Sequence, residues 1–148
     1  MKVLFLDIYG AIDNASSFFG QANPEVRYPI DAIFYDRKAL AFVQNLTNFD
    51  VKVVLIGERR KGHTLKQLQA KYDFNIFDKA EHVSFSIKTD EDHVHDWLAK
   101  HPEVERHVVL NTERHYERLT HFTVCPFDGL KYKQMLHIVH ALGIKDYK

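Results

Sequence analysis

Residues 2–12 read Lys-Val-Leu-Phe-Leu-Asp-Ile-Tyr-Gly-Ala-Ile, and this stretch decides the fold of the chain. The apolar run at residues 3–6 predicts a strand that is buried on both faces, because a strand with one wet face alternates polar and apolar side chains. The run ends in Asp7, and Gly10 predicts a turn shortly after it. We therefore expect a buried strand that delivers one carboxylate at its C-terminal end.

The rest of the chain alternates further apolar strands with amphipathic helices. Val51–Ile56 and residues 107–110 read as buried strands, which end beside Gly57 and Asn111. This alternation predicts an α/β fold of three layers, in which helices cover both faces of a mostly parallel central sheet. Shorter strand-like pieces lie at residues 75–77, 82–85 and 121–125, the expected helix N-caps are Asp36, Thr64 and Thr89 or Asp90, and a last helix follows Gly129.

Length and composition predict one domain over residues 1–148, with a long loop at 8–34 over the expected site. That loop is rich in aromatic residues, and any that stay exposed would suit a protein interface. The 20 basic and 20 acidic side chains cancel, so bulk charge does not favour nucleic acid or an anionic membrane as a partner. Cys125 is the only cysteine, and no apolar run reaches the length of a membrane span, so we expect a cytoplasmic protein.

Asp7-Ile8-Tyr9-Gly10 resembles the first motif of the haloacid dehalogenase (HAD) superfamily, which normally reads Asp-x-Asp-Gly. The likeness extends over nearly the whole chain. It is similar to the small cap-less domains associated with Swiss Army Knife RNA repair proteins, through residues 53–60 around the second strand and residues 96–112 near the end. The resemblance implies an HAD-like (Rossmannoid) fold without a large cap domain.

The resemblance also implies catalytic roles for Asp7, Tyr9 and Lys88. Asp7 stands where the superfamily has its nucleophile, which forms an aspartyl-phosphate. Tyr9 replaces the general acid and base, and a phenol with a pKa of about 10 is a poor base at neutral pH. Lys88 matches the lysine of the third motif. Each has a plainer interpretation as well: Asp7 as a cap of the following loop, Tyr9 as a packing residue that fills the pocket, and Lys88 as a solvated lysine.

The residues after the strand ends are candidates for binding an anion or a metal. By the resemblance, Ile56 or Gly57 replaces the Ser or Thr that binds the phosphoryl group in the superfamily, and Asn111-Thr112 replaces the acidic residues that hold Mg²⁺. Asp7 with Asn111 alone would hold Mg²⁺ weakly, because this ion prefers charged oxygen ligands, and we expect no other cofactor. A basic rim there would suit a phosphate, an RNA end or an acidic protein surface, although a solvated face is the default interpretation. The candidate anion-binding residues are Gly57, Arg59, Arg60, Thr112 and Arg114.

Several hypotheses about function follow from these residues. We favour a catalytically degenerate HAD-like protein, a pseudophosphatase that binds or regulates a protein partner. The alternative is a divergent phosphohydrolase that uses Asp7 on nucleic-acid ends or another phosphomonoester, and a related alternative binds a phosphorylated ligand without turnover. A lower alternative is a metal-independent dehalogenase-like hydrolase, since Asp-x-Tyr-Gly also resembles the motif of the 2-haloacid dehalogenases.

Overall fold

The computed structural model describes residues 1–29, 32–82, 87–112, 119 and 121–147. Its centre is a sheet of five strands in the order β3-β2-β1-β4-β5, and every pairing between these strands is parallel. This order is that of the Rossmann fold, with the first strand at the middle of the sheet. The strands are β1 (Lys2–Asp7), β2 (Val51–Ile56), β3 (Asp78–Lys79), β4 (Arg106–Asn111) and β5 (His121–Thr123).

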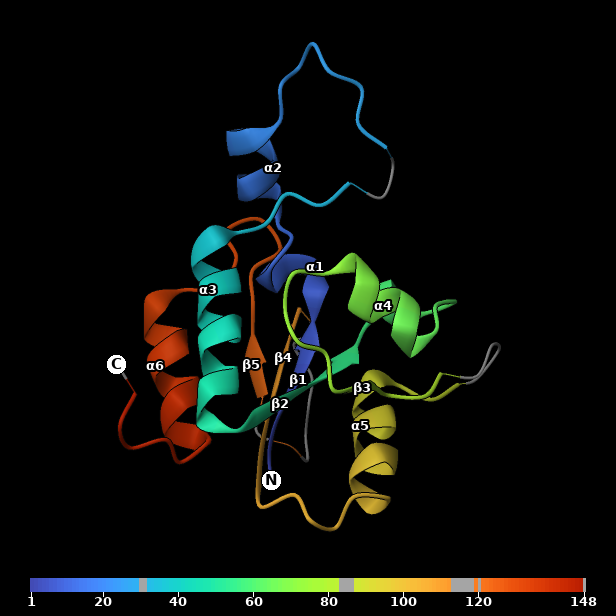
Figure 1. Ribbon diagram of the computed structural model, residues 1–148, viewed down its shortest axis with the longest axis vertical. Coiled ribbons are helices and arrows are strands. Elements are labelled where there is room, and N and C mark those ends of the chain that lie inside the picture. The colour runs from blue at the N-terminus through green and yellow to red at the C-terminus, as the bar shows by residue number, and fades with distance from the viewer. Residues whose placement is uncertain (30–31, 83–86, 113–118, 120, 148) are drawn as a thin grey trace.

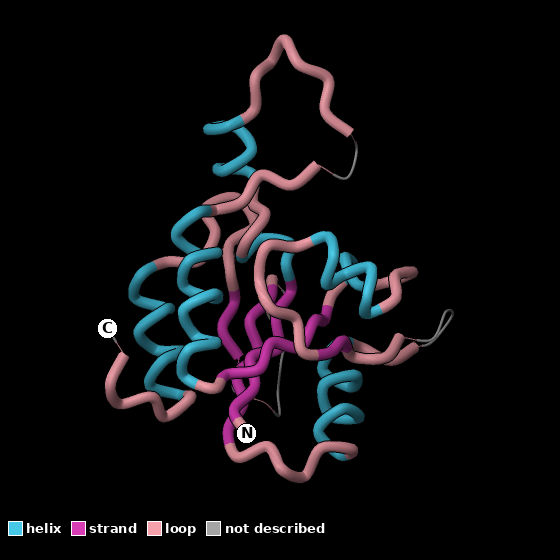
Figure 2. Tube along the Cα trace, viewed as in Figure 1, coloured by secondary structure: helices cyan, strands magenta, loops and turns pink. Residues whose placement is uncertain are grey.

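Helices cover both faces of the sheet, which confirms the predicted three-layer α/β architecture with a parallel sheet and no large cap. In Figure 1, α3 and α6 lie side by side on one face and α5 lies on the other, and Figure 2 shows the strands between these two layers. The helices are α1 (Ile8–Ala11), α2 (Ala15–Gln21), α3 (Arg37–Leu46), α4 (Leu65–Lys71), α5 (Asp90–Ala99) and α6 (Tyr132–Ala141), with short 3₁₀ turns at Thr47–Phe49 and Glu58–Arg60. In the described part of the chain, no helix is both long enough and apolar enough to cross a membrane.

The central strand contributes to two hydrophobic cores, one on each side of the sheet. Leu4 and Leu6 face the larger core beneath α3 and α6. Val3 and Phe5 face the smaller core beneath α5, where the ring of Phe5 meets Trp97 edge-on at 5.5 Å between ring centroids. Because side chains alternate between the faces of a strand, burial on both sides requires the uninterrupted apolar run that the sequence shows.

The predicted helix N-caps are present. The Asp36 carboxylate accepts a hydrogen bond from a backbone N–H in the first turn of α3. Thr64 with Gln67, and Thr89 with Asp92, form capping boxes in which each side chain bonds the other residue's backbone N–H. Each such cap satisfies N–H groups that have no partner within the helix, so the local sequence alone predicts where these helices begin.

The short strands differ from the prediction. The third strand lies at Asp78–Lys79 rather than at residues 75–77, although the backbone N–H of Phe77 already bonds the carbonyl of Val53 in β2. This strand is at the edge of the sheet, where charged residues are common and an apolar run is not required. The piece predicted at 82–85 lies almost wholly outside the described residues, and the last strand ends at Thr123, before the exposed Cys125.

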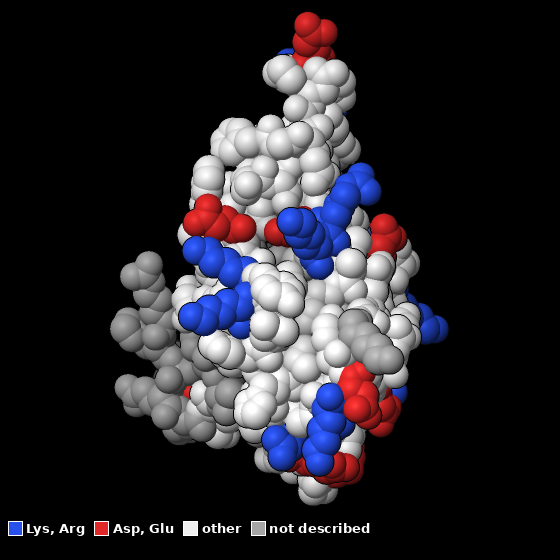
Figure 3. Space-filling view, turned by 90° about the vertical axis from the view of Figure 1, so that its left-hand side faces the viewer, with Lys and Arg blue, Asp and Glu red and all other residues white. Residues whose placement is uncertain are grey.

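The predicted loop at 8–34 contains two short helices and projects beyond the carboxyl edge of the sheet. Figure 1 shows α2 and the chain that follows it at the top of the molecule, above α1 and the ends of the central strands. In Figure 3 this projecting part carries few charged side chains, and most of them lie at its tip. The segment therefore adds a surface with few charges next to the edge of the sheet where α/β folds bind ligands.

Candidate functional site

Asp7 lies where the strand order of the sheet reverses. The strand β1 pairs with β2 on one side and with β4 on the other, so the crevice beyond its C-terminal end is the topological switch point of the sheet. Asp7, Gly57 and Asn111 lie at the same edge of the sheet, because the three parallel strands that they end or follow are neighbours. The side chain of Asp7 is nevertheless only 7% exposed.

The carboxylate of Asp7 caps the turn that follows it. Its Oδ1 accepts a hydrogen bond from the backbone N–H of Tyr9 at 3.1 Å. It also lies directly over Gly57, where any Cβ would overlap the carboxylate, and Gly57 has a φ of +80°. A glycine is required there on both grounds, so the position of Gly57 is explained by the close approach of Asp7.

The end of β4 is buried, and its residues contact the first turn of the chain. Asn111 has no solvent exposure, and the methyl group of Thr112 lies against Gly10, where a Cβ would come within 2.6 Å of it. Within the described residues, no group of three or more His, Cys, Asp or Glu side chains is placed to hold a metal ion. One carboxylate with one carboxamide does not fit the needs of Mg²⁺, which prefers several hard oxygen ligands in octahedral geometry.

Arg60 lies inside the fold and not on a rim open to ligands, so the expectation that its charge faces solvent is wrong. Arg60 is only 1% exposed. The guanidinium donates hydrogen bonds to the carbonyls of Ala80 and Gly57 and contacts His93 Nδ1 at 2.9 Å. It also forms an ion pair with Asp90 at 3.4 Å. These contacts link the loop after β2 to the N-terminus of α5, because a buried guanidinium needs partners for its donors.

Lys88 is exposed and forms an ion pair with Asp96 at 2.5 Å. The hydrogen bond and charge of Asp96 raise the pKa of Lys88, and the same contact lowers the pKa of the Asp96 carboxyl. The ammonium is therefore held against α5. Arg114 lies outside the described residues.

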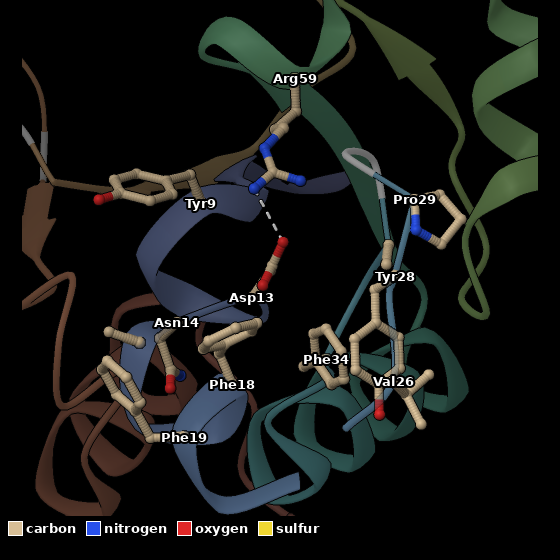
Figure 4. A pocket seen from close by; sticks show the side chains of 12 residues that line it. Tyr9, Asp13, Asn14, Phe18, Phe19, Val26, Tyr28, Pro29, Phe34 and Arg59 are labelled. Carbon is tan, nitrogen blue, oxygen red and sulfur yellow. Dashed lines mark ion pairs between the residues drawn. The ribbon is translucent and has the colours of Figure 1, made fainter. Parts of the chain in front are cut away.

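A cavity of about 610 Å³ lies beneath the projecting segment, and Tyr9 lies at one end of it without filling it. Tyr9 is 47% exposed, so its ring is not packed in the core. Figure 4 shows its ring pointing away from the middle of the cavity. Asp7 does not line this space. We call this space the insert cavity. Its lining residues are Tyr9, Asp13, Asn14, Ala15, Phe18, Phe19, Val26, Tyr28, Pro29, Ala32, Phe34 and Arg59.

Arg59 and Asp13, which both line the insert cavity, form an ion pair. Arg59 approaches the Asp13 carboxylate at 2.8 Å, with the Asp13 side chain the more deeply buried of the two. Figure 4 shows the two groups facing each other above the rings of Phe18, Phe34 and Tyr28. Burial raises the pKa of the nearby Tyr72 hydroxyl, and the Arg59 charge acts in the opposite direction.

Aromatic rings form one wall of the insert cavity. Phe34 lies between Phe18 and Tyr28, with edge-to-face contacts of 5.1 Å and 4.8 Å between ring centroids. Phe18 also contacts Phe19 at 5.4 Å, and Phe19 is 70% exposed. Edge-to-face geometry is favourable for such rings. An exposed ring, however, does not contribute the free energy that burial of its apolar surface would provide.

Asp13 and Asn14 are residues of this site that the sequence analysis missed. The signal available was the composition of the loop, whose aromatic residues the sequence analysis connected with a protein interface. Asn14 also has a local role, because its side chain caps α2 and donates to the Asp36 carboxylate at 3.1 Å. Neither residue belongs to a spacing pattern that predicts binding, and only the folded chain brings Asp13 opposite Arg59.

Comparison of the chain with family models, with curated proteins and with solved structures gives no match.

Proposed function

We propose that this protein is a binding module that captures its partner in the insert cavity and does not hydrolyse phosphate esters. The observation that carries the proposal is the cavity itself: about 610 Å³, with aromatic rings on one side and the Arg59–Asp13 ion pair. Small-ligand and anchor pockets have this size and this balance of apolar walls with a few polar groups.

The environment of Asp7 supports the second half of the proposal. A working nucleophile must reach a phosphorus atom, whereas this carboxylate is buried, accepts the Tyr9 N–H and lies against Gly57. The residues beside it offer neither a second carboxylate nor a hydroxyl at the end of β2. Tyr9, which would take the position of the general acid by the resemblance, turns its ring away from the middle of the insert cavity (Figure 4).

A divergent phosphohydrolase is the second candidate, and the position of Asp7 at the switch point of the sheet is the observation that favours it. Hydrolysis of phosphomonoesters, including 5′- and 3′-phosphorylated oligonucleotides, separates the two functions when it is measured with Mg²⁺. We expect no turnover that depends on Asp7. A rate that disappears in Asp7→Asn would contradict our proposal and support the hydrolase.

Binding is tested by nuclear magnetic resonance of the ¹⁵N-labelled full chain with a library of small aromatic fragments. We expect the fragments that bind to shift the amide signals of the insert cavity, and to lose affinity in Phe19→Ser. Phe77→Ser is the matched control, because Phe77 is also an exposed phenylalanine but does not line this cavity. The proposal fails when no fragment shifts these signals, or when the shifts gather at another surface.

A further inference from the structure

We propose that the insert cavity binds an uncharged aromatic side chain together with the peptide group beside it, so that the partner is a segment of another protein. This inference rests on the proposed binding function and names the chemistry of its ligand. Three features of the cavity carry it: the neutral charge of its lining, the adjacent donor and acceptor, and the aromatic wall.

The described residues of the lining carry no net charge. Arg59 and Asp13 are the only charged side chains among the described residues that line the cavity, and they are paired at 2.8 Å. An anionic ligand that approaches Arg59 also approaches the Asp13 carboxylate, and a cationic ligand that approaches Asp13 also approaches the guanidinium. Charges of like sign placed together in an interface are strongly unfavourable, so the pair discriminates against both kinds of ion.

The same pair offers a donor next to an acceptor, which is the pattern that a peptide group requires. A peptide carbonyl accepts from guanidinium N–H groups, and a peptide N–H donates to a carboxylate. The guanidinium has five N–H groups in a fixed fork, and the Arg59 side chain remains about one-third exposed with Asp13 bound. A peptide group laid along the pair can therefore satisfy both of its polar atoms at once.

The aromatic wall supplies the anchor for a ring. Phe18, Phe34 and Tyr28 already form a series of edge-to-face contacts, and the figure shows these rings below the ion pair (Figure 4). One further ring from a ligand extends this series in the geometry that aromatic pairs prefer. Aromatic anchors in such pockets carry most of the affinity at protein interfaces.

The test uses three probes with the same ring and different charge: N-acetyl-phenylalaninamide, which is neutral, N-acetyl-phenylalanine, which is an anion, and phenylalaninamide. The measurement is made at pH 6.5, because the amino group of the third probe, with a pKa of about 7.7–8, is then mostly protonated. Dissociation constants come from the amide shifts of the full chain. We expect the neutral probe to bind about tenfold more tightly than either ion, which corresponds to about 1.4 kcal/mol.

Two variants make the prediction specific to the ion pair. Asp13→Asn leaves Arg59 as the one charged side chain among the described lining residues, so the preferred probe should become the anion N-acetyl-phenylalanine. Arg59→Gln leaves Asp13 in that position, so the preferred probe should become the cation phenylalaninamide. The first variant removes a negative charge and the second removes a positive charge, so their effects on probe preference should be opposite. Circular dichroism checks that each variant folds, and either one is a sufficient test if the other does not.

The outcomes separate this inference from the proposed function. If the cavity binds the probes but does not prefer the neutral one, or if uridine or adenosine binds more tightly than N-acetyl-phenylalaninamide, the peptide inference is overturned while the binding function stands. If no probe and no nucleoside shifts the signals of the cavity, both fail together. Unchanged probe preference in Asp13→Asn and Arg59→Gln also overturns the inference.

Discussion

Replacing Arg60 by methionine should destabilise the protein strongly, because this guanidinium lies inside the fold and its partners lie there with it. The substitution keeps a side chain of similar length but removes the donors to the Ala80 and Gly57 carbonyls and the partner of His93. It also leaves the Asp90 carboxylate, which is 13% exposed, without this cation. Removing one member of a buried ion pair costs about 3–5 kcal/mol, because the other charge stays buried and uncompensated.

The free energy of unfolding is measured in urea by linear extrapolation, with the fluorescence of Trp97, the only tryptophan, as the signal. A loss of about 3 kcal/mol corresponds to a fall in Tm of roughly 6–12 °C for a chain of this size. Arg59→Met is the matched control. Its guanidinium is partly exposed and is paired with Asp13, so we expect a loss of about 1 kcal/mol or less.

The double variant Arg60→Met with Asp90→Asn tests the cause. Neutralising Asp90 removes the orphaned charge, so the double variant should lose less stability than the sum of the two single variants. If Arg60→Met costs no more than Arg59→Met, or if the two changes at 60 and 90 are additive, the argument from an uncompensated buried charge is refuted.

Two further predictions concern the backbone beside Asp7 and the dependence of stability on pH. Gly57→Ala should lower the free energy of unfolding in urea by about 1–3 kcal/mol, because its Cβ would overlap the Asp7 carboxylate at a φ of +80°. Gly20→Ala in α2 is the control: its Cβ meets no atom within 4 Å, so the change should be neutral or slightly stabilising. Equal effects of the two substitutions would contradict this prediction. Burial, with a smaller contribution from His95, lowers the pKa of His107 below its ordinary value of 6.5. As the pH falls, the imidazole is therefore protonated in the unfolded chain before it is protonated in the folded protein. The folded protein loses stability as the pH falls below about 6.5. His107→Gln should therefore flatten the loss of stability between about pH 7 and pH 5, and a curve as steep as that of the unchanged protein would contradict the assignment.

Most of the framework of the fold could be predicted from local sequence. The apolar runs of β1, β2 and β4 have no alternation, and this pattern is typical of strands that are covered on both faces. The caps at Asp36, Thr64 and Thr89 act over three residues, so they can be recognised without the rest of the chain. The edge strand β3 could not be located in this way, because a strand at the edge of a sheet pairs on one side only and does not require an apolar run.

The candidate site was less predictable than the fold. Tyr9, Arg59 and Asp7 were predicted to be site residues; the first two line the insert cavity, and Asp7 does not. Asp13, Asn14 and the aromatic wall belong to the same cavity but come from a stretch that the sequence showed only as a loop rich in aromatic residues. A cavity depends on which side chains of distant segments face each other, and a linear pattern does not contain this information.

The sequence by itself determined the layered α/β architecture, the strand ends at one edge of the sheet, and a single carboxylate at the end of the first strand. Only the tertiary structure decided which of two adjacent arginines could meet a ligand. Arg59 and Arg60 have the same chemistry and lie in one 3₁₀ turn, Glu58–Arg60. Successive residues of such a turn point about 120° apart, so one side chain reaches the insert cavity and the other enters the contact between β2 and α5.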